Sequence, residues 1–539
     1  MYLKPNAVIE PLIDRWYAWS HLISPATAAM NIVGRHLKIM NSFIQAPQIH
    51  AAAVKNPKML GGPFMDIPPE HVEAVRALRD QTLDKRAHLL DLAKSIRELE
   101  AMLRQHPKGY SLESAYEKIP DPLKGYVELV YDLNHNIAYR FFEPLLYHSP
   151  FYDKSLQSLA LWLTENDDRP FVLSTPRLDE AQVLHLPIPF DHPFIDAVSQ
   201  MKRTPQPLSK IKALLQLNPV QEGLLEQLFT EVPPPAYEHY TGDKIRMRYF
   251  GHACILIETK NMSILVDPLI SYYGYEHTVD RFSDVDLPDV IDYVLITHNH
   301  QDHILFETLL PLRHKIRNII VPRSTAGSLQ DPNLKWMFQN IGFQQVVELG
   351  DMEKIHFEKC TITGIPFIGE HCDLNIQSKS CYLVQNDRFR MLFAADSCNI
   401  EKRLYEHIHA LVGDIDVLFL GMECDGAPLT WLYGPLLTED LARDKDGSRR
   451  LAGSNYERGI NMVNAFNPKE VYVYAMGMEP WLKFISSIQY TDESNPIIAS
   501  NKLIQQCRTD GRTSERLFGE KEILYETSGI QALEMLQEA

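Results

Sequence analysis

The sequence lacks the features of a secreted or membrane-bound protein. It has seven cysteines in 539 residues, all at or beyond Cys254, and no Cys-x-x-Cys pair. An odd number of cysteines without paired spacing argues against a disulfide framework and for buried thiols in a reducing compartment. Met1-Tyr2-Leu3-Lys4-Pro5 opens no apolar signal segment, and no run of about 18 apolar residues follows. We therefore expect a cytoplasmic protein without a membrane partner.

Basic residues are also fewer than acidic ones. Lys and Arg number 53 against 70 Asp and Glu, which gives a formal charge of −17. Such a chain is not drawn to the phosphates of nucleic acid, so no nucleic-acid partner is expected. The hydrophobic content of 45% is ample for well-formed cores, and the length predicts roughly two or three domains.

The chain divides near Pro233-Pro234-Pro235, a stretch that neither a helix nor a central strand tolerates. We predict a largely helical α+β domain over residues 1–235. It contains no spaced ligand motif, which favours a structural, dimerising or partner-docking role. The predicted helices are Pro11–Asn41, one long amphipathic helix over Glu70–His106, and Leu123–Tyr147; the predicted short strands are Pro170–Leu173 and Val183–Leu186.

Residues 236–539 alternate short apolar runs with helical spans, which predicts sheets covered by helices. The predicted strands are Ile245–Tyr249, Cys254–Ile257, Ser263–Val266, Tyr293–Ile296, Asn318–Val321, Cys381–Val384, Arg390–Ala394, Val417–Leu420 and Val471–Tyr474. The predicted helices are Phe306–His314, Lys335–Ile341, Glu401–Leu411 and Asn455–Phe466.

One segment directly after a predicted strand carries the chemistry. Thr297-His298-Asn299-His300-Gln301-Asp302-His303 places three histidines and a carboxylate within six residues. His298 and His300 are two apart, so at the mouth of a strand their imidazoles can converge on one cation, while Asp302 and His303 can reach a second. Imidazole and carboxylate suit Zn, Fe or Mn. The motif therefore predicts a dinuclear metal site without choosing the metal.

This motif resembles that of the metallo-β-lactamase superfamily when three further segments are included. They are Gly251-His252-Ala253 within Ile245–Thr259, the strand and turn Ile264-Leu265-Val266-Asp267-Pro268, and Ala394-Ala395-Asp396. The resemblance covers about residues 240–480 and implies an αββα sandwich with its metals at the edges of two facing sheets. It also implies that Asp396 bridges the two metals and that Asp267 orients ligand histidines by hydrogen bonding.

The departures from the hydrolases of that superfamily are informative. Where a histidine usually follows the strand into the third metal-binding loop, this chain reads Gly369-Glu370-His371-Cys372, and no histidine closes the last strand at Val473–Met478. With Glu370 as the ligand, His298, His300 and Glu370 would hold one metal and Asp302 and His303 the other. Three imidazoles and three carboxylates favour iron over zinc. His371 in place of Glu370 would restore a more zinc-like site.

The whole chain resembles a narrow branch of the superfamily, the dinuclear-iron β-hydroxylases of nonribosomal peptide biosynthesis. His298, His300, Asp302, His303, Glu370 and Asp396 each match a metal ligand of that branch in order and spacing. The resemblance implies two iron ions, dioxygen as co-substrate and an external electron donor. The substrate would be an aminoacyl thioester on the phosphopantetheinylated carrier domain of a nonribosomal peptide synthetase, hydroxylated at its β-carbon. The N-terminal domain would form a homodimer and shape the substrate channel.

Two alternatives stay open at this point. The first is a dinuclear zinc hydrolase acting on a thioester, lactone or phosphodiester, because a metal-bound hydroxide could use the same motif. The second is a scaffold role with a vestigial metal site. Metal analysis separates the oxygenase from the hydrolase, since two irons that respond to oxygen support the oxygenase, whereas two zincs with thioesterase activity and no oxygen uptake support the hydrolase.

Other residues receive narrower hypotheses. Glu423 follows the strand Val417–Leu420 and is the candidate catalytic carboxylate, placed to bind water or a substrate amine; the alternative is a carboxylate satisfied by backbone amides in a turn. Asp425 lies two residues further on. His252 is expected to pack or orient rather than ligate, and Cys372, Cys398 and Cys424 are expected to be protonated packing residues. Trp431-Leu432-Tyr433 forms either a pocket wall or an aromatic packing cluster. Arg443, Lys445, Arg449 and Arg450, in a predicted loop, are the candidate docking patch for an acidic carrier; a solvated loop with interleaved Asp440, Asp444 and Asp446 explains the run equally well.

Overall fold

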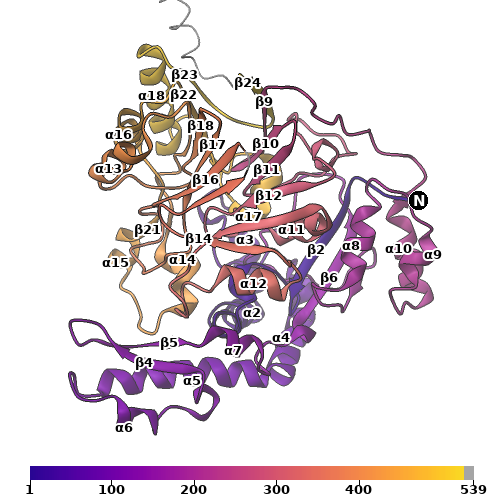
Figure 1. Ribbon diagram of the computed structural model, residues 1–539. Coiled ribbons are helices and arrows are strands. Elements are labelled where there is room, and N and C mark those ends of the chain that lie inside the picture. Colours follow the sequence, from indigo (N-terminus) through magenta and orange to yellow (C-terminus); the bar gives the residue numbers. More distant parts are fainter. Residues whose placement is uncertain (358, 527–539) are drawn as a thin grey trace, which may run out of the picture.

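The computed structural model describes residues 1–357 and 359–526. An α+β N-terminal part, from indigo to magenta in Figure 1, packs against one side of a C-terminal part that contains two large sheets (Figure 1). None of the helices in the described ranges has both the length and the apolar character that a bilayer crossing requires.

Each of the two sheets has seven strands. The first has the order β14-β13-β12-β11-β10-β9-β24 and the second β15-β16-β17-β18-β19-β22-β23. The first consists of β9 (Ile245–Gly251), β10 (Cys254–Thr259), β11 (Met262–Val266), β12 (Ile291–Leu295), β13 (Ile316–Pro322), β14 (Val346–Leu349) and β24 (Lys521–Tyr525). The second consists of β15 (Lys354–Phe357), β16 (Cys360–Ile365), β17 (Cys381–Asn386), β18 (Phe389–Phe393), β19 (Val417–Gly421), β22 (Glu470–Tyr474) and β23 (Thr513–Arg516).

All nine predicted strands and all four predicted helices of this half are present. Its helices are α11 (Phe306–Leu312), α12 (Leu334–Asn340), α13 (Lys402–Val412), α14 (Leu429–Tyr433), α15 (Arg443–Ser448), α16 (Tyr456–Phe466), α17 (Lys483–Ser486) and α18 (Asn495–Thr509). Parallel pairing joins β11 to β14 in sequence order, and also β18, β19, β22 and β23. The carboxyl ends of these parallel strands therefore gather at one edge of each sheet.

Three cores hold the layers together. Apolar side chains of both sheets, such as Ile255 and Phe393, pack against each other in the middle. α13, α16 and α18 cover the outer face of the second sheet. The outer face of the first sheet, including Leu265 and Val294, packs against α11, α12 and the N-terminal part in one continuous core. The αββα sandwich is confirmed, with the N-terminal part added to one outer layer.

The N-terminal part holds more strand than predicted. Its main sheet has the order β3-β2-β6-β7. Its strands are β1 (Tyr2–Leu3), β2 (Ala7–Ile13), β3 (Trp16–Tyr17), β4 (Val127–Tyr131), β5 (Ile137–Phe141), β6 (Gln157–Leu163), β7 (Leu184–Leu186) and β8 (Phe229–Thr230). Its helices are α1 (Pro25–Asn31), the π-helical turn η2 (Ile32–His36), α2 (Leu37–Gln45), α3 (Pro47–Ala53), α4 (Val72–Lys85), α5 (Ala87–Gln105), α6 (Glu113–Tyr116), α7 (Glu143–Tyr147), α8 (Pro193–Gln200), α9 (Leu208–Lys212) and α10 (Pro219–Gln227).

Two predicted helices are therefore partly wrong. β2 and β3 occupy the start of Pro11–Asn41, which becomes helical only at Pro25. Leu123–Tyr147 is mainly the β4–β5 hairpin, because Asp132 turns the chain by accepting hydrogen bonds from the backbone amides of Asn134 and Asn136. Pro170–Leu173 is a turn rather than a strand, whereas the strand predicted at Val183–Leu186 is confirmed as β7.

The predicted long helix Glu70–His106 is two helices, α4 and α5, divided at Arg86. The Arg86 side chain turns inward, where its Nε lies 3.0 Å from Asp14 Oδ1 and its Nη1 lies 3.2 Å from Asp153 Oδ2. A buried cation needs such partners, so its pairing redirects a stretch whose apolar periodicity alone predicts a continuous helix.

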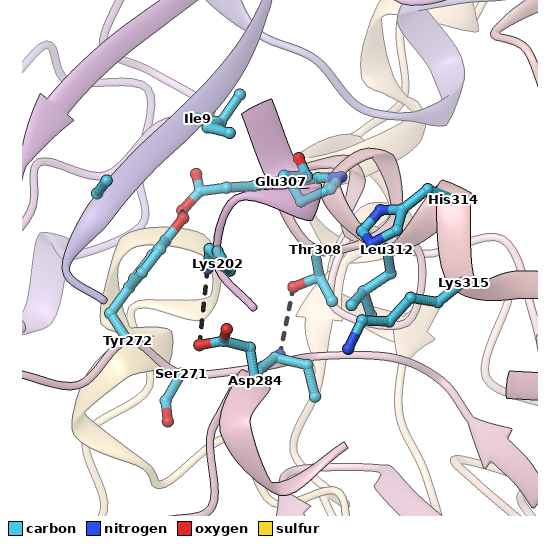
Figure 2. A pocket seen from close by; sticks show the side chains of 14 residues that line it. Ile9, Lys202, Ser271, Tyr272, Asp284, Glu307, Thr308, Leu312, His314 and Lys315 are labelled. Atoms are coloured by element: carbon cyan, nitrogen blue, oxygen red, sulfur yellow. Dashed lines mark hydrogen bonds and ion pairs between the residues drawn. The ribbon is translucent and has the colours of Figure 1, made fainter. Parts of the chain in front are cut away.

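The two parts of the chain are joined by a buried ion-pair network. Arg169 donates to Glu307 at 2.7 and 2.9 Å and to Glu10 on β2 at 3.0 Å, and Tyr272 donates to Glu307 at 2.9 Å. Figure 2 shows Tyr272 and Glu307 meeting beside a cavity of about 40 Å³. That volume holds a few waters at most, so we interpret the cavity as part of the interface rather than as a substrate site.

Removing Arg169 should destabilise the protein strongly, because Arg169→Met leaves two buried carboxylates with less compensation. Loss of one partner of a buried pair costs about 3–5 kcal/mol of unfolding free energy. Arg76→Met, which breaks an exposed pair with Glu73, should cost under about 1 kcal/mol. Thermal and denaturant unfolding of both variants measures the difference, and equal stabilities would contradict the role of the network.

Candidate metal centre

The predicted site residues meet where the strands of both sheets end. Asp267 follows β11, the segment His298–His303 follows β12, Glu370 lies beyond β16, Asp396 follows β18, and Glu423 follows β19. Strands of two facing sheets that end at the same edge bring these loops together, although they are up to 156 residues apart in sequence.

The backbone at this edge is strained. Positive φ angles occur at His252 (52°), Asp267 (40°), Glu370 (67°), Ala395 (45°) and Ala475 (52°). None of these is a glycine, and each such conformation costs of order 1–3 kcal/mol unless the surroundings enforce it. The concentration of this strain at one edge marks it as a functional site.

The first group of potential ligands is His298, His300 and Glu370, whose donor atoms all lie within 4.8 Å of one another. His300 Nδ1 lies 2.9 Å from Glu370 Oε1, and His298 Nε2 lies 3.9 Å from Glu370 Oε2. These are the three residues that the sequence assigned to one metal. His371 contacts Glu370 through Nδ1 at 2.9 Å but belongs to none of the groups found in the described residues.

Asp396 lies between the two predicted metal positions. Its Oδ2 is 3.1 Å from His303 Nε2 and 3.8 Å from His298 Nε2, so a single carboxylate faces an imidazole of each position. Asp302 lies in a further group with His303 and His252. All six predicted ligands therefore fall in three groups that overlap through His298 and His303.

Each of the three motif histidines is held through one ring nitrogen. Asp267, which is fully buried, lies 2.8 Å from His303 Nδ1 and also accepts hydrogen bonds from the Thr297 backbone amide and hydroxyl. The Thr297 hydroxyl lies 3.0 Å from His298 Nδ1, and the Tyr433 hydroxyl lies 3.1 Å from His300 Nε2. The other nitrogen of each ring faces the carboxylates. The predicted orienting bond from Asp267 is confirmed.

The electrostatics of the group depend on burial and on mutual charge. Burial lowers the pKa of His303, but the carboxylates of Asp267 and Asp396 outweigh it and raise the pKa well above 6.5. Burial raises the pKa of Glu370, but His300 and His371 lower it to about 2. Burial dominates at Asp396, whose pKa is raised.

Several secondary expectations are also resolved. His252 contacts Asp302 at 3.4 Å, as expected of an orienting residue. It also belongs to a group of potential metal ligands with Asp302 and His303, although the sequence analysis did not favour His252 as a ligand. Glu423 lines the cavity over the centre and accepts a hydrogen bond from the Gly426 amide at 2.6 Å, whereas Asp425 is exposed.

The cysteines near the site are not paired. Cys372 and Cys398 are buried and Cys424 is half-buried, all as free thiols. Burial raises the pKa of Cys372 to about 12 and that of Cys424 to about 11, so both are protonated at neutral pH, as predicted.

Sequence reasoning gave Arg449 the wrong environment. Its Nε donates 2.8 Å to the Cys372 carbonyl from a half-buried position, so it supports the loop of Glu370 rather than an open docking patch. The segment before it is the short helix α15 instead of a loop.

A cavity of about 820 Å³ opens over the centre and is walled by both parts of the chain. The inner end carries His300, Asp302, Glu370, Asp396 and Glu423. The walls come from Lys58–Phe64 of the N-terminal part and from Trp431 and Leu432 of α14, so the Trp431 segment does line a pocket. Tyr433 of the same helix contacts His300, a partner that sequence periodicity gave no means of finding.

Comparison with known proteins identifies the family. Residues 2–233 match the model described as the diiron non-haem β-hydroxylase N-terminal domain, and residues 262–427 match a β-lactamase superfamily domain. The chain is 39% identical to a 4-amino-L-phenylalanyl-[CmlP-peptidyl-carrier-protein] 3-hydroxylase of Streptomyces venezuelae, over 96% of this chain and 98% of that one. The chain belongs to the diiron β-hydroxylase family.

Solved structures of this family agree with that assignment. The crystal structure of CmlA, a diiron β-hydroxylase from Streptomyces venezuelae, superposes with a TM-score of 0.91 at 38% identity and covers 97% of this chain and 99% of its own. A variant of the same enzyme gives a TM-score of 0.90. The protein is therefore a non-haem diiron monooxygenase, and the relationship over nearly the whole chain favours this function over a zinc hydrolase.

The residues present fit a diiron cofactor. His298 Nε2 and Asp396 Oδ1 are buried and have no hydrogen-bond partner among the described residues. Buried polar atoms without partners are costly, and cations bound beside them would satisfy both. The mixed imidazole and carboxylate set suits iron.

Asp267→Asn should weaken iron binding by roughly 10–100-fold, because an amide cannot supply the charge that stabilises the His303 imidazole through Nδ1. Asp292→Asn removes a carboxylate from β12 away from the centre and serves as the matched control. Iron content after dialysis against a graded chelator measures the effect. Equal retention in the two variants would remove Asp267 from the metal-supporting role.

Proposed function

We propose that this diiron hydroxylase acts on an aminoacyl group held as a thioester on the carrier domain of a nonribosomal peptide synthetase, and that it hydroxylates the β-carbon. The observation that carries the proposal is the large cavity that connects the metal-binding residues with the surface through walls from both halves of the chain. The 39%-identical relative, whose substrate is a carrier-bound aminoacyl group, supports it.

In this proposal His298, His300 and Glu370 would hold one iron, Asp302 and His303 would hold the other, and Asp396 would serve both. When bound, the two irons supply dioxygen activation with electrons from an external donor, a chemistry that no side chain provides. Ala475 lines the cavity beyond β22 and lies in the segment Val473–Met478, which has no closing histidine. Its methyl group offers no ligand and leaves room at the centre.

The protein's own residues then orient the metal ligands and position the substrate. Asp267, Thr297 and Tyr433 keep the motif imidazoles oriented, so the reacting carbon meets a fixed centre. Glu423 lines the same cavity, and we assign it the substrate's α-amino group. Trp431, Leu432 and Phe64 form apolar walls that exclude water from the cavity.

The cavity is polarised along its length. Carboxylates gather at the inner end, while Lys58, Arg443 and Arg450 line the same cavity and are exposed. Arg450 is anchored by the carbonyls of Asp425 and Gly426. We assign these three cations, rather than Arg449, to binding the anionic phosphopantetheine arm and its carrier. They form a local basic patch on an otherwise acidic chain.

Three further assignments belong to the same proposal. The chain divides into an N-terminal domain at 1–235 and a metal domain at 236–539. The N-terminal domain forms a homodimer; the projecting hairpin β4–β5, with Leu133 fully exposed at its tip, is the candidate contact (Figure 1). The enzyme works in the cytoplasm, where an electron-transfer partner reduces it.

The decisive experiment loads a phosphopantetheinylated carrier domain with single amino acids and adds reduced, iron-containing enzyme and dioxygen. We expect two irons per chain and a mass gain of one oxygen on the carrier with at least one amino acid. Two zincs per chain, thioester cleavage and no oxygen uptake would overturn the proposal in favour of the hydrolase.

Reversing the charge of the cavity mouth should weaken carrier binding. Arg443→Glu/Arg450→Glu should raise KM for the loaded carrier roughly tenfold and reduce its dependence on salt, with iron content unchanged. Arg388→Glu/Lys402→Glu changes the net charge equally at exposed positions outside the cavity lining. Equal KM values for the two double variants would argue against this docking surface.

The ionisation of Glu423 should appear in the pH profile. Burial raises its pKa to about 7, so the carboxylate that binds a cationic amine is lost as the pH falls through 7. We expect kcat/KM to decline below this pH in the wild type, while Glu423→Gln is low at all pH values and loses the inflection. An unchanged inflection in Glu423→Gln would show that another group titrates.

A further inference from the structure

The C-terminal end of α14 has a missing hydrogen-bond donor. The Gly434 amide donates to the Thr430 carbonyl, which is a normal helical bond. The next bond would run from residue 435 to the Trp431 carbonyl, but residue 435 is proline and has no N–H. The Trp431 carbonyl therefore requires a donor from outside the helix.

Arg35 of the N-terminal part supplies that donor. Its Nη2 lies 2.7 Å from the Trp431 carbonyl and 3.0 Å from the Leu432 carbonyl. Burial lowers the pKa of Arg35 to about 10, so the guanidinium remains charged at neutral pH. A cation at the carbonyl end of a helix is also favoured by the helix dipole.

The backbone around Arg35 is shaped for this contact. Arg35 lies in the π-helical turn η2, an irregularity that frequently marks functional sites. A Cβ atom on its neighbour Gly34 would lie 2.9 Å from both Cα and Cβ of Pro435. Only glycine permits this approach, so the pair Gly34-Arg35 is fitted to Gly434-Pro435 across the boundary between the two parts.

The helix that Arg35 holds reaches the metal centre at two points. Tyr433 places its hydroxyl 3.1 Å from His300 Nε2. Trp431 lines the cavity and donates from Nε1 to the Gly61 carbonyl at 2.8 Å, which ties the cavity wall to the same helix. Arg35 itself is absent from the cavity lining and from the groups of potential ligands in the described residues.

We propose that Arg35 is a positioning residue of the metal centre, acting through α14 to hold Tyr433 against His300. The inference rests on the proposed role of His300 as an iron ligand. An imidazole whose outer nitrogen is fixed presents its other nitrogen in one tautomer and one orientation. The N-terminal part thereby controls a ligand that belongs to the metal domain.

The test compares Arg35→Met, Arg35→Lys and Tyr433→Phe with Lys38→Met, an exposed residue of α2, as the control. Full-length iron-loaded proteins are compared by iron retention against a chelator and by the integer-spin magnetic resonance signal of the reduced protein. We expect Arg35→Met and Tyr433→Phe each to weaken iron retention roughly tenfold and to shift the signal in the same way. Arg35→Lys should restore most of both, because one ammonium can donate to both carbonyls.

The double variant Arg35→Met/Tyr433→Phe distinguishes a relay from two separate effects. If Arg35 acts through Tyr433, the double variant resembles Tyr433→Phe alone; additive losses would overturn the proposal. Where Arg35→Met fails to fold, Gly34→Ala displaces Pro435 while keeping the guanidinium. Gly34→Ala should then reproduce the shifted signal, and an unshifted signal would overturn the proposal.

The outcomes also separate this inference from the proposed function. A wild-type protein without iron or hydroxylation would contradict the proposed function. A wild-type protein that binds iron and hydroxylates the carrier-bound group, alongside an Arg35→Met protein with the same iron retention and signal, would contradict only the role of Arg35.

Discussion

The metal centre depends on one buried carboxylate. Asp267 has no exposed surface and receives hydrogen bonds from the Thr297 amide, the Thr297 hydroxyl and the His303 ring. Removing a carboxylate from water is expensive unless such partners replace the lost hydration. The whole loop that follows β12 is consequently built around this side chain. Thr297 passes the constraint on to His298, so a single residue sets the orientation of two imidazoles.

The N-terminal part completes the centre instead of merely adjoining it. The sandwich alone presents ligands at an open edge, as a hydrolase would. Here the segment Lys58–Phe64 closes one wall, and Arg169 and Arg35 attach the two parts through charged contacts to Glu307 and to the carbonyl end of α14. An oxidising centre needs a substrate held in one position and water kept away. The added part serves that requirement on a scaffold shared with hydrolases.

The predictability of each feature follows from how local its cause is. Nine of the fourteen strands that form the two sheets are short apolar runs whose burial dictates their conformation, so they were predictable, whereas β15 and β24 alternate exposed and half-buried residues and were missed. The His298–His303 motif follows from spacing alone. The break at Arg86 and the hairpin at Asp132 depend on side-chain contacts that periodicity does not encode. The contact of Tyr433 with His300 joins residues 133 positions apart. Contacts of this kind arise from the topology of the fold, so no local pattern in a single sequence predicts them.

The positive φ angles explain why the sequence left open whether Glu370 or His371 faces the centre. Glu370 and Ala395 adopt left-handed conformations that neither side chain favours. Sequence signals for such turns come from glycine, and Gly369 precedes Glu370 but does not reveal which following residue faces the centre. Lys379 holds the Gly369 carbonyl at 3.1 Å and Arg449 holds the Cys372 carbonyl at 2.8 Å, so two cations from distant segments clamp this loop on both sides of Glu370. Within the described residues this loop places Glu370, and not His371, in a group of potential metal ligands.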